Sequence, residues 1–363
     1  MSRKATIITI YDPRPNYGNR LQNYASQMIL KSLNLDIATV AYEKRLLTGR
    51  KKIKYILQKI SGYHLPGNKE YWKVVIPRLM AFDKFNRKYI NTVEISDLSD
   101  VPTSNYYVLG SDQVWNTAWY DVNLMKKDLF LLTFAKPEQK ICFSPSFSVT
   151  EMDEKWLPWF REHLATFPSL GVREESGAIL IKEMTGKEAQ VTLDPTLMLN
   201  ASDWRQLAAQ PKKVDCSRKY ILTYFLGGHS ERVNADLERY SKEIGAHIYN
   251  LLDTSQPELY KADPAQFIYL IDHAQLVLTD SFHACVFSFL LGKPFLVYNR
   301  EGKENNMMSR MDTLLGRFDL KRKYADSGLE NSLLECDYSN GYKTLEDERK
   351  KTLQFLKNSM NLQ

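Results

Sequence analysis

The stretch from Leu276 to Val297 limits the possible folds more than any other part of the chain. An apolar run ends at a polar elbow that carries His283, an apolar segment of helix length follows, and residues 292–294 (Gly-Lys-Pro) lead into another apolar run. This order predicts strand, loop, buried helix and strand in a parallel sheet. His283 then lies in the first helical turn, at the carboxyl end of a strand, where open α/β sheets bind their ligands.

The same alternation of strand-like runs and helix-length segments recurs along the chain, and it predicts parallel sheets with crossover helices in both halves. The runs span residues 5–11, 37–42, 106–109, 140–144, 169–172, 190–193, 220–226, 247–252, 275–279 and 294–298. Since 363 residues are many for one domain, we expect an α/β protein with two Rossmann-like parallel-sheet domains that face a cleft.

The predicted domain boundary follows the strand at residues 190–193, where Asp194-Pro195 forms a turn and a capped helix begins near Ser202. We expect a hinge at about residues 194–202, an N-terminal domain over 1–195 and a C-terminal domain over 196–363. The last predicted helix, residues 345–357, could return to the first domain.

The composition, 44% hydrophobic and 25% charged, is typical of a soluble globular protein. No run reaches the ~18 to 20 apolar residues that span a bilayer. The N-terminus is interpreted as a first strand and not as a signal peptide, so we expect a cytoplasmic protein. The four cysteines lie far apart and predict neither a disulfide framework nor a metal site.

Residues 44–60 carry seven basic side chains and no acidic one, with apolar residues at 53, 56, 57 and 60 on one helical face. Such a basic helix could lie on an anionic membrane surface, which would make the protein peripheral at the inner face of the membrane. The alternative is a helix that packs on the core with a solvated basic face. No nucleic-acid-binding module is recognised, so nucleic acid is not an expected partner.

Two polar loops follow predicted strands of the first half. In residues 15–24, Gly18 permits close backbone approach, and the helix from about Asn19 offers free amides to an anion or a sugar hydroxyl. In residues 110–116, Asp112, Gln113 and Trp115 provide hydroxyl partners and a stacking face for a sugar. The alternatives are an ordinary turn for the first loop, and for the second a helix cap with Trp115 in the core.

Two arginines are candidates for holding an anion. Arg173 follows the strand at residues 169–172 and could form a two-pronged contact with a carboxylate or phosphate. The next two residues, Glu174 and Glu175, are expected to favour the dipole of the helix that they begin. Arg310 is the second candidate, with a surface salt bridge as the alternative.

Five segments together resemble the polysaccharide pyruvyl transferase family, in order and over nearly the whole chain. They are residues 16–22 (Asn-Tyr-Gly-Asn-Arg-Leu-Gln), 110–116 (Gly-Ser-Asp-Gln-Val-Trp-Asn), 172–176 (Val-Arg-Glu-Glu-Ser), 193–196 (Leu-Asp-Pro-Thr), and 279–283 (Thr-Asp-Ser-Phe-His) with 292–294. The resemblance implies a GT-B-like fold of two lobes. It also implies transfer of the enolpyruvyl unit of phosphoenolpyruvate onto two hydroxyls of one sugar, giving a cyclic pyruvate ketal in a capsular, exopolysaccharide or cell-wall precursor.

That reaction needs an acid, a base and cationic clamps, and no metal or redox cofactor. We assign His283 as the acid/base, because the intrinsic pKa of a histidine side chain is ~6.5, and Asp112 as the group that orients or deprotonates an acceptor hydroxyl. Many relatives carry an arginine where this chain has Ser281. The donor is therefore expected on Arg173, Arg310, the Ser281 hydroxyl and the amides of the helix start.

The acceptor sugar, expected on a lipid-linked oligosaccharide, is assigned to the two loops of the first domain. Its predicted contacts are Asn16, Gly18, Asn19, Gln22, Gln113 and Trp115. Two other functions remain open at this stage, because a fold does not fix a function. One is a glycosyltransferase that uses a nucleotide sugar, and the other is a glycan-binding member of the family without catalysis.

Overall fold

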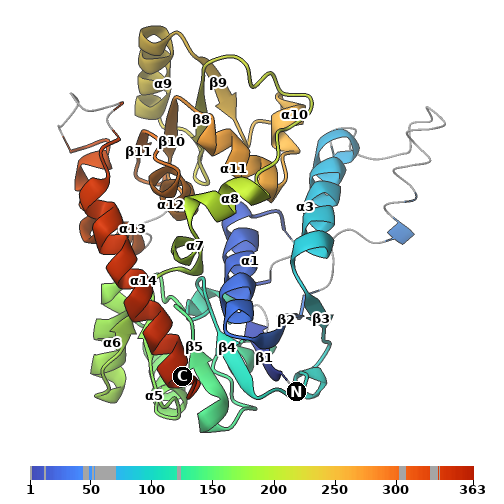
Figure 1. Ribbon diagram of the computed structural model, residues 1–363, viewed down its shortest axis with the longest axis vertical. Helices are drawn as coiled ribbons and strands as arrows, with labels where there is room; N and C mark the ends of the chain where they lie inside the picture. Colours follow the sequence, from blue (N-terminus) through green and yellow to red (C-terminus); the bar gives the residue numbers. More distant parts are fainter. Residues whose placement is uncertain are drawn as a thin grey trace.

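The first lobe is built on a five-stranded parallel sheet with the order β3-β2-β1-β4-β5 (Figure 1). This computed structural model describes residues 2–11, 14–43, 49–50, 53, 71–120, 124–301, 308–327, 334 and 336–363. The strands are β1 (Arg3–Ile8), β2 (Leu35–Ala41), β3 (Thr92–Glu94), β4 (Tyr106–Leu109) and β5 (Lys140–Cys142). The chain leaves β1 for β2 on one side and later adds β4 on the other, so the strand order reverses between β1 and β4. Ligands of open α/β sheets bind at the carboxyl end of such a switch point.

The helices of the first lobe connect these strands and cover the sheet. They are α1 (Tyr17–Ser32), α3 (Ile76–Tyr89), which follows a π-helical turn at Tyr71–Val75, α4 (Leu124–Leu129), α5 (Leu157–Leu164) and α6 (Glu175–Thr185). A parallel pair, β6 (Gly171–Val172) and β7 (Gln190–Val191), forms a separate small sheet. Short 3₁₀ turns lie at Leu98–Asp100, Thr117–Trp119, Pro137–Gln139 and Glu154–Trp156.

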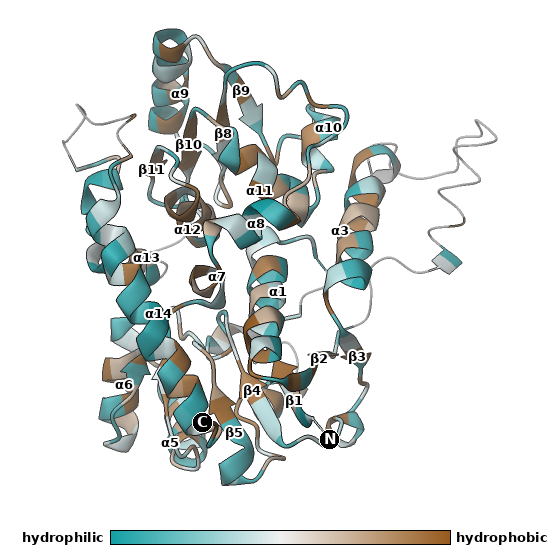
Figure 2. Cartoon of the chain, viewed as in Figure 1, coloured by the Kyte–Doolittle hydropathy of each residue, from teal (hydrophilic) through white to brown (hydrophobic). Residues whose placement is uncertain are grey.

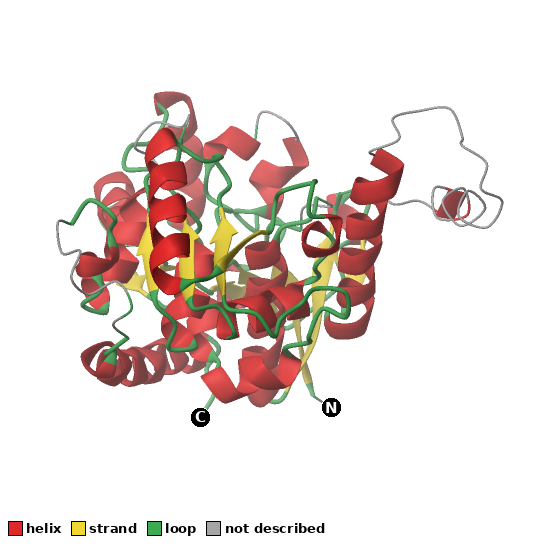
Figure 3. Ribbon diagram, turned by 90° about the horizontal axis from the view of Figure 1, so that it is seen from above, coloured by secondary structure: helices red, strands yellow, loops and turns green. Residues whose placement is uncertain are grey.

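The second lobe has a four-stranded parallel sheet with the order β11-β10-β8-β9. Its strands are β8 (Tyr220–Tyr224), β9 (His247–Asn250), β10 (Leu276–Thr279) and β11 (Phe295–Val297). Its helices are α9 (Glu231–Ile244), α10 (Pro257–Tyr260), α11 (Pro264–Asp272), α12 (Phe282–Leu290) and α13 (Met308–Arg317), followed by a 3₁₀ turn at Lys321–Lys323. Helix α12 is buried at every position and is coloured hydrophobic in Figure 2. Seen from above, helices flank the strands of the protein on both sides (Figure 3).

The segment between the lobes contains α7 (Pro195–Met198) and α8 (Ala201–Leu207). The long helix α14 (Ser339–Ser359) then runs along one side of the molecule and ends near β5 of the first lobe (Figure 1). It holds the connecting segment, because Arg349 donates hydrogen bonds to the carbonyls of Leu197 and Leu199 and Thr352 Oγ1 accepts one from Leu193 N. One core of buried apolar side chains is continuous from β1 of the first lobe to β11 of the second.

These sheets confirm the predicted fold class of two Rossmann-like parallel-sheet units. Strand β1 ends three residues before the predicted end, and α14 begins six residues before the predicted helix. Within the described part of the chain, no helix is both long and apolar enough to cross a membrane. The basic segment 44–60 lies outside the described residues, apart from residues 49, 50 and 53.

Candidate functional site

The switch points of the two sheets meet at the starts of α1 and α12. Helix α1 follows β1, and Asn16 caps it by accepting a hydrogen bond from Asn19 N at 3.0 Å. Gly18, in its first turn, lies against the His283 ring of α12, and a Cβ atom there would lie 2.0 Å from His283 Nδ1. Close approach at Gly18 was expected, but the approaching group is a side chain of the other lobe. Gly18 is buried, so its predicted contact with the acceptor is not supported.

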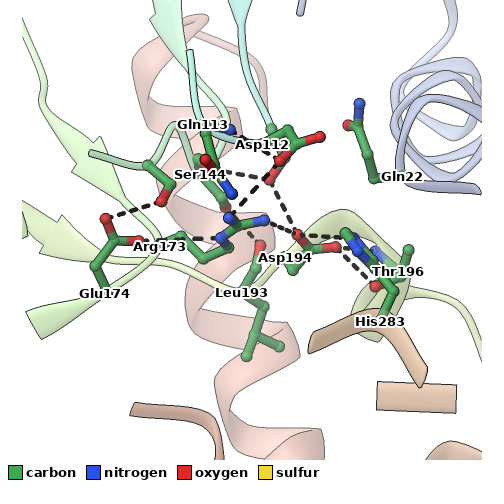
Figure 4. Close-up of polar contacts among 12 residues, drawn as sticks. Gln22, Asp112, Gln113, Ser144, Arg173, Glu174, Leu193, Asp194, Thr196 and His283 are labelled. Atoms are coloured by element: carbon green, nitrogen blue, oxygen red, sulfur yellow. Dashed lines mark hydrogen bonds and ion pairs between the residues drawn. The ribbon is translucent and has the colours of Figure 1, made fainter. Parts of the chain in front are cut away.

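Asp194 is the centre of the polar cluster at this junction (Figure 4). Its Oδ2 accepts a hydrogen bond from Arg173 Nη1 at 2.8 Å and another from Ser111 Oγ at 3.1 Å. Its Oδ1 accepts from the amide and the hydroxyl of Thr196, at 3.0 and 2.7 Å. Burial alone would raise the pKa of Asp194, but the His283 imidazole, the Arg173 guanidinium and the Thr196 hydrogen bonds lower it to about 2. Asp194 is therefore ionised at neutral pH.

His283 Nε2 points toward this carboxylate, 3.8 Å from Asp194 Oδ2, and has no hydrogen-bond partner. Burial lowers the pKa of His283 below 6.5, and the charges of Arg173 and Arg310 lower it further, against the opposite effect of Asp194 and Asp112. The imidazole is thus neutral at pH 7 and can accept a proton there. The sequence predicted His283 as an acid/base, and its burial indicates that the neutral, proton-accepting form is present before the reaction begins.

Part of the Arg173 guanidinium forms no hydrogen bond. Besides its bond to Asp194, it lies 4.0 Å from Asp112 Oδ1 and 3.9 Å from Glu174 Oε2, both beyond hydrogen-bond distance. Its Nε and Nη2 are buried and have no hydrogen-bond partner. Buried polar atoms are nearly always paired, so two unpaired donors on one buried cation indicate a place for an anionic ligand.

Arg310, near the start of α13, joins the cluster from the second lobe. It is buried, which excludes the surface salt bridge considered as its alternative role. Burial and the neighbouring Arg173 lower the pKa of Arg310 to about 9, so it keeps its charge at neutral pH. Both terminal nitrogens of Arg310 lie 2.9 Å from the carboxamide oxygen of Gln113, across the junction of the lobes. The Phe282 ring lies 4.8 Å from the Arg173 guanidinium and 6.0 Å from that of Arg310.

A small pocket that opens to solvent borders these groups. Arg173, Asp194, Phe282 and Arg310 form part of its wall, and Arg317 closes another part. Three guanidinium groups therefore line one small space.

Asp112 and the start of α1 form the first lobe's side of the junction. Asp112 has a left-handed backbone (φ 73°), and its carboxylate lies 3.5 Å from Asn19 Nδ2. Its side chain is 14% exposed, the most accessible of the carboxylates around Arg173. Asp112 is therefore the carboxylate that a ligand entering from this side can reach.

Two expectations for this region need correction. Trp115 is fully buried, with its indole N–H donating to Phe130 O at 3.1 Å, so it has no face for stacking on a sugar. Gln22 is also fully buried and donates to Thr9 Oγ1 at 2.9 Å, which places it away from an acceptor. Glu174, the N-cap residue of α6, makes no side-chain hydrogen bond to that helix. Its buried Oε1 instead accepts hydrogen bonds from Ser146 Oγ and two backbone amides.

The comparisons with known proteins fit this geometry. The model of the family described as polysaccharide pyruvyl transferase matches residues 16–302. The chain belongs to the polysaccharide pyruvyl transferase family. All the site residues named above lie in the matched range except Arg310 and Arg317. No curated protein sequence matches the chain significantly.

Solved structures similar to this pyruvyl transferase family member include a UDP-GlcNAc 2-epimerase from Neisseria meningitidis, at 11% identity and a TM-score of 0.45, covering 98% of this chain and 100% of the other. A glycosyltransferase from Rickettsia africae has 10% identity and a TM-score of 0.43, covering 98% of each chain. SnogD, a glycosyltransferase from Streptomyces nogalater, has 11% identity and a TM-score of 0.42, and the match covers 99% of this chain and 98% of SnogD.

Two carboxylates of this family member were missed as site residues by sequence reasoning. Asp194 was interpreted as part of a turn and of a family motif, without a role in the site, although an Asp-Pro pair directly after a strand was a usable signal. Asp280, just before the Ser281 cap of α12, accepts hydrogen bonds from Leu226 N, Gly227 N and Arg300 Nε and fixes the loop after β8. Ser281 donates its amide to Thr279 Oγ1. Within the described residues, no group of three or more His, Cys, Asp or Glu side chains could hold a metal.

Proposed function

We propose that this protein transfers the enolpyruvyl unit of phosphoenolpyruvate onto two hydroxyls of one sugar in a glycan precursor, forming a cyclic pyruvate ketal and releasing phosphate. The observation that carries the proposal is the pair of buried guanidinium groups, Arg173 and Arg310, next to a neutral His283 at the junction of the lobes. Phosphoenolpyruvate is small and carries two anionic groups, a carboxylate and a phosphate. Two buried cations with fork geometry match that charge pattern.

The residues can supply each proton transfer of the reaction. The first sugar hydroxyl gives its proton to neutral His283 while its oxygen bonds to the central carbon of phosphoenolpyruvate. The methylene carbon takes up one proton and becomes a methyl group, and the imidazolium of His283 is the donor of that proton. Asp194, ionised and 3.8 Å away, stabilises the imidazolium while it lasts.

The second half of the reaction closes the ketal. The second hydroxyl bonds to the same carbon as the carbon–oxygen bond to phosphate breaks, and phosphate leaves with the bonding electrons. Asp112, the accessible carboxylate of the first lobe, orients this hydroxyl, and its proton leaves with phosphate or through His283. Arg173 and Arg310 neutralise the charge on the departing phosphate, which is where fixed cations contribute most to the rate.

The acceptor enters from the first lobe in this account, next to Asn16, Asp112 and Gln113. Asn19 is buried and its carboxamide is bound to Ile10 O and Arg20, so it is not among these contacts. We propose a lipid-linked oligosaccharide as the acceptor, handled at the inner face of the membrane, and the basic sequence of residues 44–60 supports that proposal. The reaction itself requires phosphoenolpyruvate as co-substrate and no bound cofactor.

Thermal stability with and without ligand tests the donor. A ligand that binds only the folded protein at 100 times its Kd stabilises it by about 2.7 kcal/mol. We expect phosphoenolpyruvate to raise the melting temperature of the wild type and to do so much less for Arg310→Met. The control is Arg205→Met, which removes a half-exposed arginine paired with Asp272 and should respond like the wild type. Stabilisation by a nucleotide sugar, with none by phosphoenolpyruvate, would overturn the proposal.

A further inference from the structure

Arg78 of α3 is a buried arginine that lies outside the cluster around Asp194. It is 3% exposed, and no carboxylate of the described residues forms an ion pair with it. Its guanidinium carbon lies 5.0 Å from the centre of the Tyr17 ring, 5.1 Å from that of Phe82 and 4.7 Å from that of Tyr260. The cation is thus enclosed by three aromatic rings, an arrangement that is attractive when the charge is desolvated.

The hydrogen bonds of Arg78 cross from one lobe to the other. Its Nη1 donates to Tyr17 Oη at 3.1 Å in the first lobe and to the carbonyl of Tyr260 in the second. Tyr17 crosses the junction too, because its hydroxyl donates to Ala262 O at 3.0 Å and its ring stacks on Phe267 with centres 4.3 Å apart. Two residues of the first lobe therefore bind the end of α10 and the start of α11.

The contacts of Arg78 favour the arrangement in which the two lobes touch at α3 and α10. A buried cation without a carboxylate partner is costly unless polar groups and ring faces replace water around it. The first lobe provides the Tyr17 hydroxyl and the rings of Tyr17 and Phe82. The Tyr260 carbonyl and ring complete the replacement only while the two lobes are in contact. If the lobes separated here, Arg78 would lose the groups from the second lobe.

Tyr17 connects this contact with the site. It is the first residue of α1, and the next residue, Gly18, lies against the His283 ring. We propose that Arg78 is a positioning residue: through Tyr17 it holds the start of α1 on the second lobe, and so keeps His283 in place and shielded from water. The effect on catalysis rests on the function proposed above, whereas the effect on His283 itself does not.

The charged groups that face His283 come from elements other than α3 and α10. Asp194 caps α7, Asp112 follows β4, Arg173 follows β6 and Arg310 belongs to α13. A change at Arg78 thus reaches His283 through the contact of the lobes. Because burial lowers the pKa of His283, admission of water must raise it toward 6.5.

The test is an NMR titration of the His283 ring protons in the full-length protein, assigned with His283→Gln. We expect a higher pKa of His283 in Arg78→Met and in Tyr17→Phe than in the wild type, with Arg78→Lys in between. Tyr17→Phe keeps the ring and removes only the two hydrogen bonds of its hydroxyl, so it tests the proposal even if Arg78→Met does not fold. The control is Arg87→Ala, an exposed residue of the same helix that pairs with Asp83, and it should titrate like the wild type.

Kinetics provide the second readout. Since a displacement of ~1 Å can cost about 100-fold in rate, we expect kcat of Arg78→Met to fall by about that factor while KM for phosphoenolpyruvate changes little. Folded Arg78→Met and Tyr17→Phe proteins whose His283 titrates as in the wild type would overturn the positioning role. A shifted titration without any turnover of phosphoenolpyruvate would uphold the positioning role and contradict the proposed function.

Discussion

Asp194→Asn tests the centre of the polar cluster, because it removes the negative charge and keeps the size of the side chain. The folded protein holds the pKa of Asp194 at about 2, against 3.8 for an unperturbed carboxyl. Each pKa unit corresponds to about 1.4 kcal/mol, so ionised Asp194 stabilises the folded protein by about 2.5 kcal/mol when His283 is protonated, and by less at neutral pH, where His283 is neutral. With an unfolding entropy of ~2.1 cal/mol/K per residue, the expected loss of melting temperature is about 3 °C if the lobes unfold together.

The dependence on pH gives this prediction a second test. A carboxyl with a lowered pKa contributes its full stabilisation above the unfolded value of 3.8 and loses it as the pH falls through about 2. The difference in melting temperature between wild type and Asp194→Asn should therefore shrink below about pH 4. Between pH 8 and 5 it should not fall, because protonation of His283 adds to the attraction that Asp194 provides. Differential scanning calorimetry across this range measures it.

Asp272→Asn is the matched control, since Asp272 pairs with half-exposed Arg205 at the surface. Exposed ion pairs contribute about 0.2 to 1 kcal/mol, so the control should unfold close to the wild type. If Asp194→Asn is as stable as this control from pH 5 to 7, or if its deficit does not shrink below about pH 4, the assignment of an ionised Asp194 paired with Arg173 is wrong.

Three further predictions follow from the contacts of the site. Gly18→Ala should lower kcat by about 100-fold, because its Cβ would lie 2.0 Å from His283 Nδ1 and must displace the ring. The control is Gly316→Ala, whose Cβ meets only Lys321 Cε at 3.4 Å, and it should leave steady-state kinetics unchanged. Gln113→Glu should abolish the thermal shift with phosphoenolpyruvate, because a fixed carboxylate would occupy Arg310, whereas Gln113→Ala should retain it. Trp115→Phe should unfold at a lower temperature, for a loss of about 1 to 3 kcal/mol from the unpaired Phe130 carbonyl and the smaller ring, and should leave the KM for the acceptor unchanged.

The parallel sheets could be predicted from the sequence because buried parallel strands are continuous apolar runs of recognisable length. For the same reason the position of His283 followed from the strand before it and the apolar helix after it. Arg173 was placed correctly after a strand, and the structure adds the buried donors that make it a candidate for anion binding.

Burial of loop side chains could not be predicted in the same way. Trp115 lies in a polar loop and Gln22 in the polar first turns of α1, and whether such side chains face a ligand or the core depends on distant segments. Trp115 packs beside Phe147 with ring centres 4.9 Å apart, and Gln22 reaches back to Thr9. Local sequence contains no information about these partners.

Contacts between the lobes were the least predictable part of the site. Tyr17 meets Ala262 across 245 residues of chain, and Arg78 meets Tyr260 across 182. Asp194 acquires its role only when β6, α12 and the segment between the lobes converge. Periodicity and motif spacing describe neighbours in the chain, so they located the elements of the site and not the pairs that hold it together.

A crystal structure with phosphoenolpyruvate bound is the most direct test of the central claim. The account predicts that the ligand's anionic groups contact Arg173 and Arg310 and that its central carbon lies near His283, on the side of Asp112. Phosphoenolpyruvate bound at saturating concentration away from both arginines, with the cluster unchanged, would contradict it.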